Sequence, residues 1–316
     1  MAASNHIHRL AATPATVHWG FLDAALGCVL EIESGDRLCI ETVSGGKARL
    51  PADRERFGVL PDHLAILEAC SPDLGPHILT GPVHIRGAEP GNVLRVFIET
   101  IKLRQNWGWN EIATGCGLLP EHEALAETLT IPIDLQAGVV HLPWGGSVNA
   151  QPFFGVLAVK PDTPTGRVSS LIPGPFGGNL DVRHLGPGTE IYFPIFAAGA
   201  GFSAGDGHAI QGDGEINGSA VETSLAGTFV LTVDRQIEPP PFPYALTNSH
   251  LLTLAVDIDL DQALEWAVRS AVNVLSSRFA MSARDAYRHC SVVGHAAVSQ
   301  CVNVRKGIHF RVPLPH

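Results

Sequence analysis

The chain contains two apolar–polar stretches, HILTGPVHIRG at residues 77–87 and VLRVFIETIKL at residues 93–103, joined by the turn-forming residues AEPGN. Alternation of apolar and polar side chains on both sides of such a turn is typical of paired β-strands. The stretch VLEIESGDRLCIETV at residues 29–43 has the same form around Ser34-Gly35-Asp36. We therefore predict two β-hairpins in the first third of the chain.

Short apolar segments of the same kind continue along the chain, among them IPIDL, GVVHLP, FGVLAV, EIYFPIF, GTFVLTV and HLLTLAVDI. Many short strands separated by Gly, Pro, Asn and Asp favour an antiparallel sandwich or barrel over a doubly wound parallel sheet. The composition agrees, because 33 Gly and 23 Pro occur in 316 residues and only 16% of the residues are charged. This composition excludes a coiled coil, and the 45% hydrophobic content excludes a disordered chain.

Helical periodicity occurs only near the C-terminus. Apolar residues recur at helical spacing over residues 261–279, and Ser282 with Asp285 forms a capping box that predicts a second helix running toward Val302. The Pro-rich run EPPPFPY at residues 238–244 is typical of a linker. We therefore predict three segments: an N-terminal β-sandwich region (1–160), a Gly-rich catalytic β region (161–244) and a C-terminal α/β unit (245–316).

The charge balance argues against two classes of partner. Lys and Arg number 21 against 31 Asp and Glu, which gives a net charge of −10. Such a chain is not attracted to nucleic-acid phosphates or to anionic membrane surfaces, so we expect neither as a partner. The sequence has no secretory leader pattern and no long apolar run, and its six cysteines are scattered, so we expect a cytoplasmic protein with reduced thiols.

Residues 174–227 concentrate the chemistry, because they hold 13 of the 33 glycines together with several carboxylates. Asp206 and His208 are two residues apart and would point to the same side of an extended segment, and Asp213 and Glu215 repeat this spacing. Carboxylates with one imidazole suit a divalent ion such as zinc, which polarises carbonyl groups and lowers the pKa of a bound water toward ~7. The alternative is a pair of turns whose carboxylates cap backbone amides.

Four strings resemble the acetamidase/formamidase family of amidohydrolases, which cleave small amides to acid and ammonia. They are HILTGPVHIRGAEPGNVL (77–94), PFFGVLAV (152–159), GGNLD (177–181) and GDGHAIQGDGEINGSAVE (205–222). The resemblance implies a mainly β protein with a jelly-roll-like antiparallel sandwich, a small barrel and a C-terminal α/β unit. It also implies a homodimer and a divalent metal ion in the acidic cluster. Asn92 departs from the Asp that members carry in this turn, and Asn is an equally good turn residue.

On this basis we expect a metal-dependent amidohydrolase acting on a short-chain amide such as acetamide or formamide. Either Glu215 or Asp213 would take the proton of water, while Asp181, Asp206, His208 and Glu222 would bind the metal. Zinc is the favoured ion and calcium the alternative. The residues expected to bind substrate are His18, His77, Gly178, Asn179 and Gln211.

Two other functions stay open: an amidase for a larger or cyclic amide, and a non-catalytic β-sandwich binding module that holds a structural calcium ion.

Three rival motifs give weaker evidence of function. Ser203 lies in a G-x-S-x-G string, but the residues GDGHAIQGDGE that follow cannot form the helix that a nucleophile elbow requires. Cys116 lacks a recognisable base, and the repeat of Asp257, Asp259 and Asp261 lacks the glycine of a calcium loop, so it is better explained as a helix N-cap.

Overall fold

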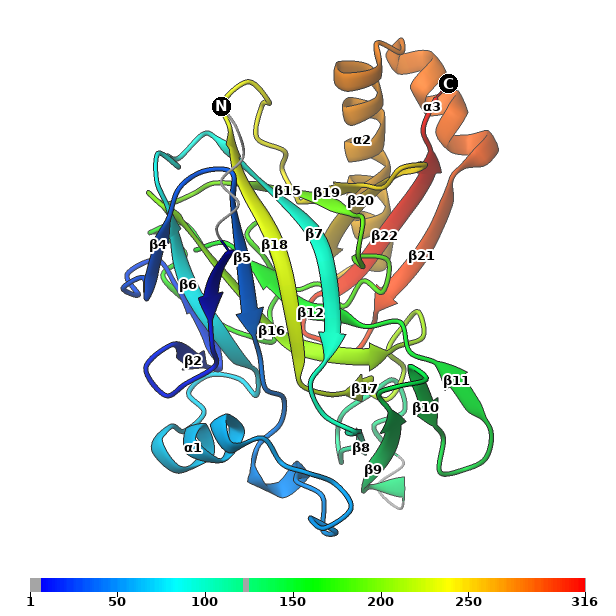
Figure 1. The fold of residues 1–316 in the computed structure, drawn as a ribbon. Coiled ribbons are helices and arrows are strands. Elements are labelled where there is room, and N and C mark those ends of the chain that lie inside the picture. The colour runs from blue at the N-terminus through cyan, green and yellow to red at the C-terminus, as the bar shows by residue number, and fades with distance from the viewer. Residues whose placement is uncertain (1–6, 122–124, 316) are drawn as a thin grey trace.

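The computed structural model describes residues 7–121 and 125–315. Two large β-sheets pack against each other, and two helices near the C-terminus lie at one end of the molecule (Figure 1). The prediction of a mainly β protein is therefore confirmed.

The first sheet has nine strands, and its neighbours are antiparallel except for the first pair. In spatial order the strands are β1 (Ile7–Leu10), β5 (Asp36–Glu41), β18 (Leu225–Asp234), β7 (Val93–Leu103), β15 (Glu190–Pro194), β19 (Tyr244–Leu246), β20 (His250–Asp257), β22 (Lys306–Pro313) and β21 (His295–Gln300). Strands from both ends of the chain thus share one sheet.

The second sheet has eleven strands. Its main path runs through β11 (Ser147–Asn149), β10 (Val139–His141), β9 (Glu127–Asp134), β8 (Trp107–Ile112), β17 (Val221–Glu222), β16 (Ala200–Ile210), β12 (Phe153–Ala158) and β14 (Gly177–Asn179). Strand β6 (Ile78–Ile85) also pairs with β16 and carries β2 (Val17–Trp19) and β4 (Leu30–Ile32) beside it. Since β16 pairs with β6, β12 and β17, it lies at the centre of this sheet. A small third sheet joins β3 (Phe21–Asp23) to β13 (Arg167–Ser169).

The main hydrophobic core lies between the two large sheets. Phe229 of β18 packs on Phe154 of β12 and Phe202 of β16, with ring centroids 5.6 and 5.5 Å apart. All three side chains are fully buried, and burial of each such side chain contributes about 1.5–3 kcal/mol. The packing of these rings fixes the position of β16, the strand that carries the polar cluster described below.

Both predicted hairpins are wrong as pairings, although their strands are present. β4 pairs with β6, whereas β5 pairs with β1 and β18. β6 and β7 likewise belong to different sheets. The turn after β4 is bonded to β18, because Gly35 donates its N–H to the carbonyl of Leu231 at 2.7 Å and Ser34 Oγ accepts from Val233 N at 2.9 Å. Each turn therefore carries the chain from one sheet to the other.

The C-terminal helices α2 (Leu260–Phe279) and α3 (Ala283–Val293) pack with strands β20 and β22 in a second hydrophobic core. Asp259 caps α2 through Asp261 N, as its N-cap interpretation predicts, and Ser282 caps α3 through Asp285 N. The predicted extension of the second helix to Val302 is wrong. The helix ends before Gly294, where a Cβ atom would collide with the ring of Phe310 and the carbonyl of Cys290, and the chain continues as β21.

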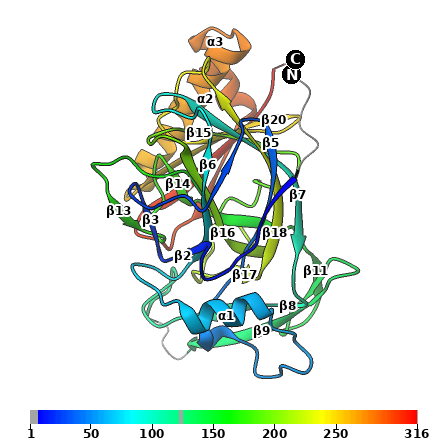
Figure 2. The same ribbon diagram turned by 60° about the vertical axis from the view of Figure 1, so that its left-hand side comes forward.

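A short helix, α1 (Pro61–Ala69), was not predicted. It lies at the opposite end of the molecule from α2 and α3 (Figure 2). Only nine residues long, it carries no clear apolar stripe, so its periodicity gave little signal in the sequence. Its buried residues Ile66 and Leu67 pack in a small core with Trp19 and Ile78. A 3₁₀ turn at Lys47–Arg49 precedes it.

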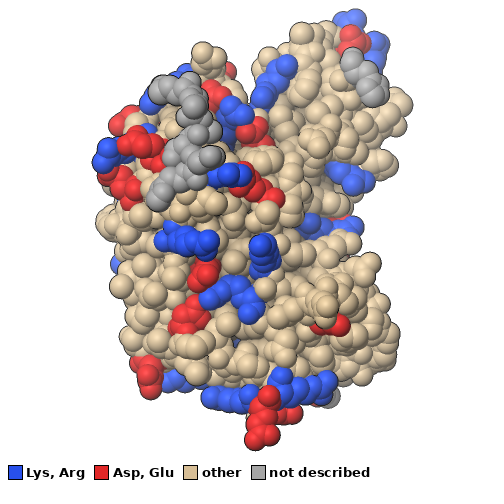
Figure 3. Space-filling model, viewed as in Figure 1, with Lys and Arg blue, Asp and Glu red and all other residues tan. Residues whose placement is uncertain are grey.

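Basic and acidic side chains are interspersed over the face shown in Figure 3. Arg37 of β5 pairs with Glu99 of β7 at 2.7 Å across the intervening β18, and Arg95 of β7 pairs with Glu190 of the neighbouring β15 at 2.7 Å. Within the described residues, no helix has the length and apolar character needed to cross a membrane. The division at residues 160 and 244 stays a prediction, and strands from all three segments contribute to the nine-stranded sheet.

His18 and Ser203 form a buried polar contact between β2 and β16. His18 Nε2 lies 3.1 Å from Ser203 Oγ, and His18 Nδ1 lies 2.6 Å from the carbonyl oxygen of Phe21. Ser203 is in the middle of a strand, so it does not occupy a nucleophile elbow. Burial lowers the pKa of His18 to about 4, although the Phe21 carbonyl partly opposes this effect, and the ring is therefore neutral at pH 7.

We predict that the free energy of unfolding falls as the pH drops from about 6.5 to 4, because the unfolded His18 takes up a proton that the folded one does not. The stability that the neutral His18 contributes is fully present above about pH 6.5. About 3 kcal/mol of it is lost by pH 4. Urea unfolding of His18→Gln at several pH values measures it: the variant should lose less stability over this range than the wild type. The exposed His141→Gln is the control, and an unchanged pH dependence in His18→Gln would contradict the prediction.

Candidate active site

Five buried ionisable side chains meet beside the end of β16. Asp206 and His208 lie on β16, and the register of β17 places Glu222 directly opposite His208. Asp181 follows β14, and Glu215 lies in the turn between β16 and β17. The antiparallel pairing of β16 with β17 and with β12, which in turn pairs with β14, thus gathers residues from four segments. We call Asp181, Asp206, His208, Glu215 and Glu222 the carboxylate cluster.

His208 is the centre of the carboxylate cluster. Its Nε2 atom lies 3.3 Å from Asp206 Oδ2 and 3.2 Å from Glu222 Oε2. Possible ligand atoms of Asp181, His208 and Glu215 lie within 4.8 Å of one another, and so do those of Asp206, His208 and Glu222. The imidazole is therefore shared by two overlapping groups of side chains that could hold a metal ion.

The backbone is strained at three of the four carboxylates. Asp181, Asp206 and Glu215 have φ values of 51°, 56° and 46°. Among the described residues, only Ala200 and Ala280 are other non-glycine residues with positive φ. A left-handed conformation costs such residues on the order of 1–3 kcal/mol and persists where the surrounding structure imposes it, often at functional sites. The fold therefore holds these carboxylates in place against a local preference.

Gly155 of β12 forms one wall of the carboxylate cluster. A Cβ atom at this position would collide with Asp206 Oδ2, and would lie 2.6 Å from Asp181 Oδ1 and 2.9 Å from His208 Cε1. Only a residue without a side chain lets three charged groups approach the strand this closely.

Several polar atoms in this region are buried without a hydrogen-bond partner among the described residues: Asp181 Oδ1, Glu222 Oε2, Asn179 Oδ1 and both ring nitrogens of His208. His208 Nε2 is close to two carboxylates but does not have a hydrogen-bonding direction toward either. The large majority of buried side-chain polar atoms in proteins are paired, so such a concentration indicates a missing partner. Carboxylate oxygens with one imidazole nitrogen are a donor set that fits a divalent cation.

The electrostatics of the carboxylate cluster also point to a cation. Burial raises the pKa of Asp181, Glu215 and Glu222, and the charge of Asp206 raises that of Asp181 further. Burial alone would lower the pKa of His208, but Glu222 and Asp206 outweigh it and raise the pKa well above its ordinary value. The imidazolium thus serves as the cation that these carboxylates require, and a divalent ion would supply two positive charges in its place.

The carboxylate cluster opens on a cavity of about 220 Å³. Asp206, Glu215 and Glu222 line one part of it, and Trp109 and Leu171 supply apolar walls. Arg49 and Glu111, which form an ion pair at 2.6 Å, also line it, and the Arg49 guanidinium lies 5.2 Å from the centroid of the Trp109 ring. The cavity is below the ~300 Å³ at which typical ligand pockets begin, so it suits a molecule of few atoms.

Two of the residues expected to bind substrate line this cavity. His77 Nε2 faces Asp206 Oδ1 at 3.8 Å, and its Nδ1 lies 3.0 Å from Ser170 Oγ. Burial would raise the pKa of Asp206, but the charges of His77 and His208 lower it below its ordinary range. Asn179 presents Oδ1 from β14, and this atom has no hydrogen-bond partner within the described residues.

The other expected residues lie outside the cavity wall. Gln211 donates Nε2 to the carbonyl of Asp181 at 3.0 Å and so braces the backbone of the carboxylate cluster. Gly178 packs against Phe176, and His18 contacts Ser203. The expectation that Asp213 faces the same point as Asp206 and His208 is wrong: it binds Arg183 at 3.0 Å near the surface, because the turn after Gly212 directs it away from Glu215.

Gly155, Trp109 and Asn303 are among the residues of the site that the sequence analysis does not predict. Gly155 had a signal in the sequence, because an isolated glycine within an apolar strand often marks a close approach. Neither Trp109 nor Asn303 has such a signal in the sequence. Asn303, which donates Nδ2 to Asp181 Oδ2 at 3.2 Å, belongs to a turn more than a hundred residues from its partner. Cys116 lines the cavity, as a catalytic thiol would, but the structure gives it no histidine partner among the described residues.

A family model described as the acetamidase/formamidase family matches residues 28–167 and 168–237. The chain belongs to this family. The resemblance inferred from the sequence strings is thus confirmed.

Members of the acetamidase/formamidase family with solved structures share the whole fold. An acetamidase from Bacillus halodurans is 30% identical, with a TM-score of 0.82 and 97% of each chain covered. An acetamidase from Yersinia enterocolitica is 25% identical, with a TM-score of 0.84, and 99% of this chain and 94% of that chain are covered. A formamidase from Methylophilus methylotrophus is 28% identical over 191 residues, which are 44% of this chain and 47% of that protein. The chain spans about half the length of the curated relatives that it matches.

We predict that Gly155→Ala weakens divalent-ion binding at least ~10-fold, because the added methyl group would occupy the space between Asp181, Asp206 and His208. Overpacking of this kind costs about 1–3 kcal/mol of stability. Gly186→Ala is the control, since nothing lies within 4 Å of a Cβ atom there. Ion binding by equilibrium dialysis, with thermal unfolding of both variants, tests the prediction. Wild-type ion affinity in Gly155→Ala would contradict it.

Proposed function

We propose that this chain hydrolyses a short-chain primary amide to a carboxylic acid and ammonia, with a divalent ion held by the carboxylate cluster. The observation that carries this proposal is the group of buried, unpartnered carboxylate and imidazole atoms that opens on a cavity of about 220 Å³. Similarity to proteins named formamidase and acetamidase gives further support. The homodimer stays a prediction from the family resemblance.

Asp181, Asp206, His208 and Glu222 would hold the ion. When bound, a divalent ion polarises a carbonyl group and lowers the pKa of a water molecule toward ~7. An imidazole among the ligands favours zinc over calcium, which takes a shell of six to eight oxygen atoms. The two unpartnered ring nitrogens of His208 support this choice.

Glu215 is the group we assign to proton transfer. It lines the cavity, and burial together with the charge of Asp181 raises its pKa well above the ordinary value. A carboxyl group whose pKa is raised toward the working pH accepts and returns a proton more efficiently than an ordinary one. Glu215 would take a proton from the attacking water and deliver it to the amide nitrogen. Cleavage of the C–N bond then releases ammonia rather than an amide anion, which is a very poor leaving group.

The remaining lining residues would orient the substrate and limit its size. The unpaired Oδ1 of Asn179 can accept a hydrogen bond from the NH₂ group of a primary amide. His77, held by Ser170, keeps Asp206 ionised beside the reacting centre. Trp109 and Leu171 close the apolar side of the cavity, where only a short acyl group would fit.

We predict that the purified protein contains a tightly bound divalent ion and releases ammonia from formamide or acetamide. Removal of the ion with a chelator should abolish hydrolysis, and addition of zinc should restore it. Full activity of ion-free protein would contradict the metal role. Hydrolysis confined to larger or cyclic amides would favour that alternative, and ion binding without hydrolysis of any amide would favour the binding module.

We predict that Glu215→Gln lowers kcat for acetamide by about 10²–10⁴-fold, because the amide side chain cannot transfer the proton. The ion content should stay at the wild-type level, since Glu215 is not among the proposed ligands. Glu238→Gln, an exposed carboxylate on the segment after β18, is the matched control. Ammonia release and metal analysis test both parts, and a kcat within a few-fold of wild type would overturn the assignment.

A further inference from the structure

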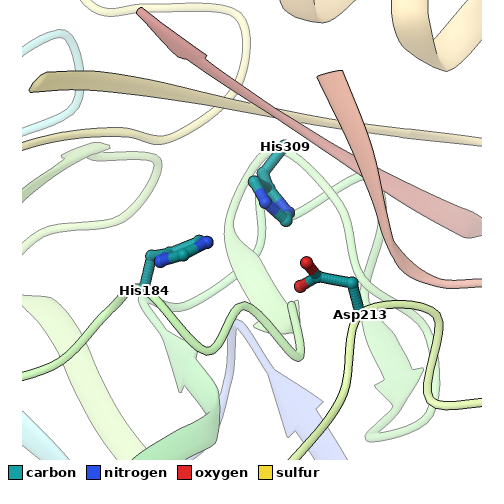
Figure 4. A group of neighbouring side chains, drawn as sticks. All are labelled: His184, Asp213 and His309. Atoms are coloured by element: carbon teal, nitrogen blue, oxygen red, sulfur yellow. The ribbon is translucent and has the colours of Figure 1, made fainter. Parts of the chain in front are cut away.

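Outside the carboxylate cluster, three more metal-binding side chains converge from separate parts of the chain. His184 follows β14, Asp213 lies in the turn after β16, and His309 lies on β22. One possible ligand atom from each lies within 4.8 Å of the other two. Figure 4 shows the two rings and the carboxylate directed toward one another. The ring centroids of His184 and His309 are 5.0 Å apart.

His309 is held in one orientation. Its side chain is buried, and Nδ1 lies 3.0 Å from Oγ of Ser299, which is itself buried. This contact leaves Nε2 without a hydrogen-bond partner among the residues that the structure describes. Histidines that bind metals commonly have the second ring nitrogen fixed by such a contact. Ser299 thus prepares His309 to act as a ligand.

His184 is half-buried and Asp213 is exposed, so these two side chains approach His309 from the solvent side. No hydrogen bond is found for the ring of His184 within the described ranges, and Asp213 uses Oδ1 for Arg183 Nε at 3.0 Å. The second carboxylate oxygen of Asp213, Oδ2, is not used in this ion pair and could bind a metal ion. The guanidinium of Arg183 opposes a cation at this point, so a bound ion would be held less tightly than one in the carboxylate cluster.

Both imidazoles are neutral at pH 7. Burial lowers the pKa of His309 to about 4, and burial together with the charge of Arg183 lowers the pKa of His184. A histidine must lose its proton before it binds a metal ion, and these two need no further deprotonation at neutral pH.

We propose that His184, Asp213 and His309 form a second site for a divalent transition-metal ion such as zinc. Two imidazole nitrogens and one carboxylate oxygen are the ligands that such ions take, whereas calcium and magnesium prefer oxygen atoms alone. Three protein ligands leave at least one coordination position for water. The site differs in chemistry from the carboxylate cluster, which offers four carboxylates and one imidazole.

An ion at this second site would fasten the turn that carries Glu215. That turn already contacts β21 through Gly214 N to the carbonyl of Ser299 at 3.0 Å, and the segment after β21 through Cys301 N to the carbonyl of Gly214 at 3.1 Å. Asp213 is the residue before Gly214, so its ligation would add a link from the turn to β22. This consequence for Glu215 rests on the proposed function, but ion binding itself does not.

Zinc binding to the full chain tests the second site. After removal of metals, equilibrium dialysis should give about two zinc ions per chain in the wild type and about one in His184→Gln and in Asp213→Asn. Asp206→Asn, in the carboxylate cluster, should lose the tighter ion and keep the weaker one. His141→Gln, an exposed histidine that contacts Ser147, is the control and should bind as the wild type does.

A second variant separates ligation from folding. Ser299→Ala retains all three ligands and should weaken the second ion about 10–100-fold while the first ion binds normally. The proposal is overturned if His184→Gln and Asp213→Asn bind as many ions as the wild type with the same affinities. It is also overturned if the wild type binds only the ion that Asp206→Asn removes. Loss of amide hydrolysis alone would bear on the proposed function and not on this site.

Discussion

The constraint on which the rest of the structure depends is the burial of four carboxylates around one imidazole. Like charges out of water repel strongly, and isolated buried charges cost many kcal/mol unless a cation or hydrogen bonds compensate them. Here the compensation within the chain is incomplete: His208 carries one positive charge, and several carboxylate and imidazole atoms have no partner among the described residues. A bound cation would supply the missing compensation, so the polarity of the site and its proposed function would have one physical cause.

The two sheets provide the rigid support that this cluster needs. One side of β16 packs into the main core through Phe202 and Ala204, and the same strand continues to Asp206 and His208. The glycines of this region let neighbouring strands approach it: Gly205 lies against Leu79 of β6, Gly207 against Leu225 of β18, and Gly155 against the charged groups. Side chains at these positions would push the strands apart. The concentration of glycine in this part of the chain thus follows from the close packing around the site.

The sequence predicts local features well, but it predicts poorly which distant strands pair and which distant side chains meet. Strands β7 and β18, the helix predicted at residues 261–279 and the N-caps of the two C-terminal helices depend on side-chain alternation or on contacts within four residues, and the sequence predicts them. The pairing of β4 and β5 depends on which distant strand bonds to the turn at Gly35, and the hairpin signal carries no information about β18. In the same way, spacing alone placed Asp206 and His208 together correctly but could not exclude Asp213, whose direction is set by a turn and by Arg183. Asn303 reaches Asp181 from the C-terminal part of the chain, which no local pattern indicates.

The most direct test of this account is an anomalous-scattering map, collected at the zinc absorption edge, from crystals grown with zinc. The account predicts a strong peak within bonding distance of Asp206, His208 and Glu222, beside the Cα atom of Gly155. A map with no anomalous peak among these residues, obtained from protein that hydrolyses a short-chain amide, would contradict it.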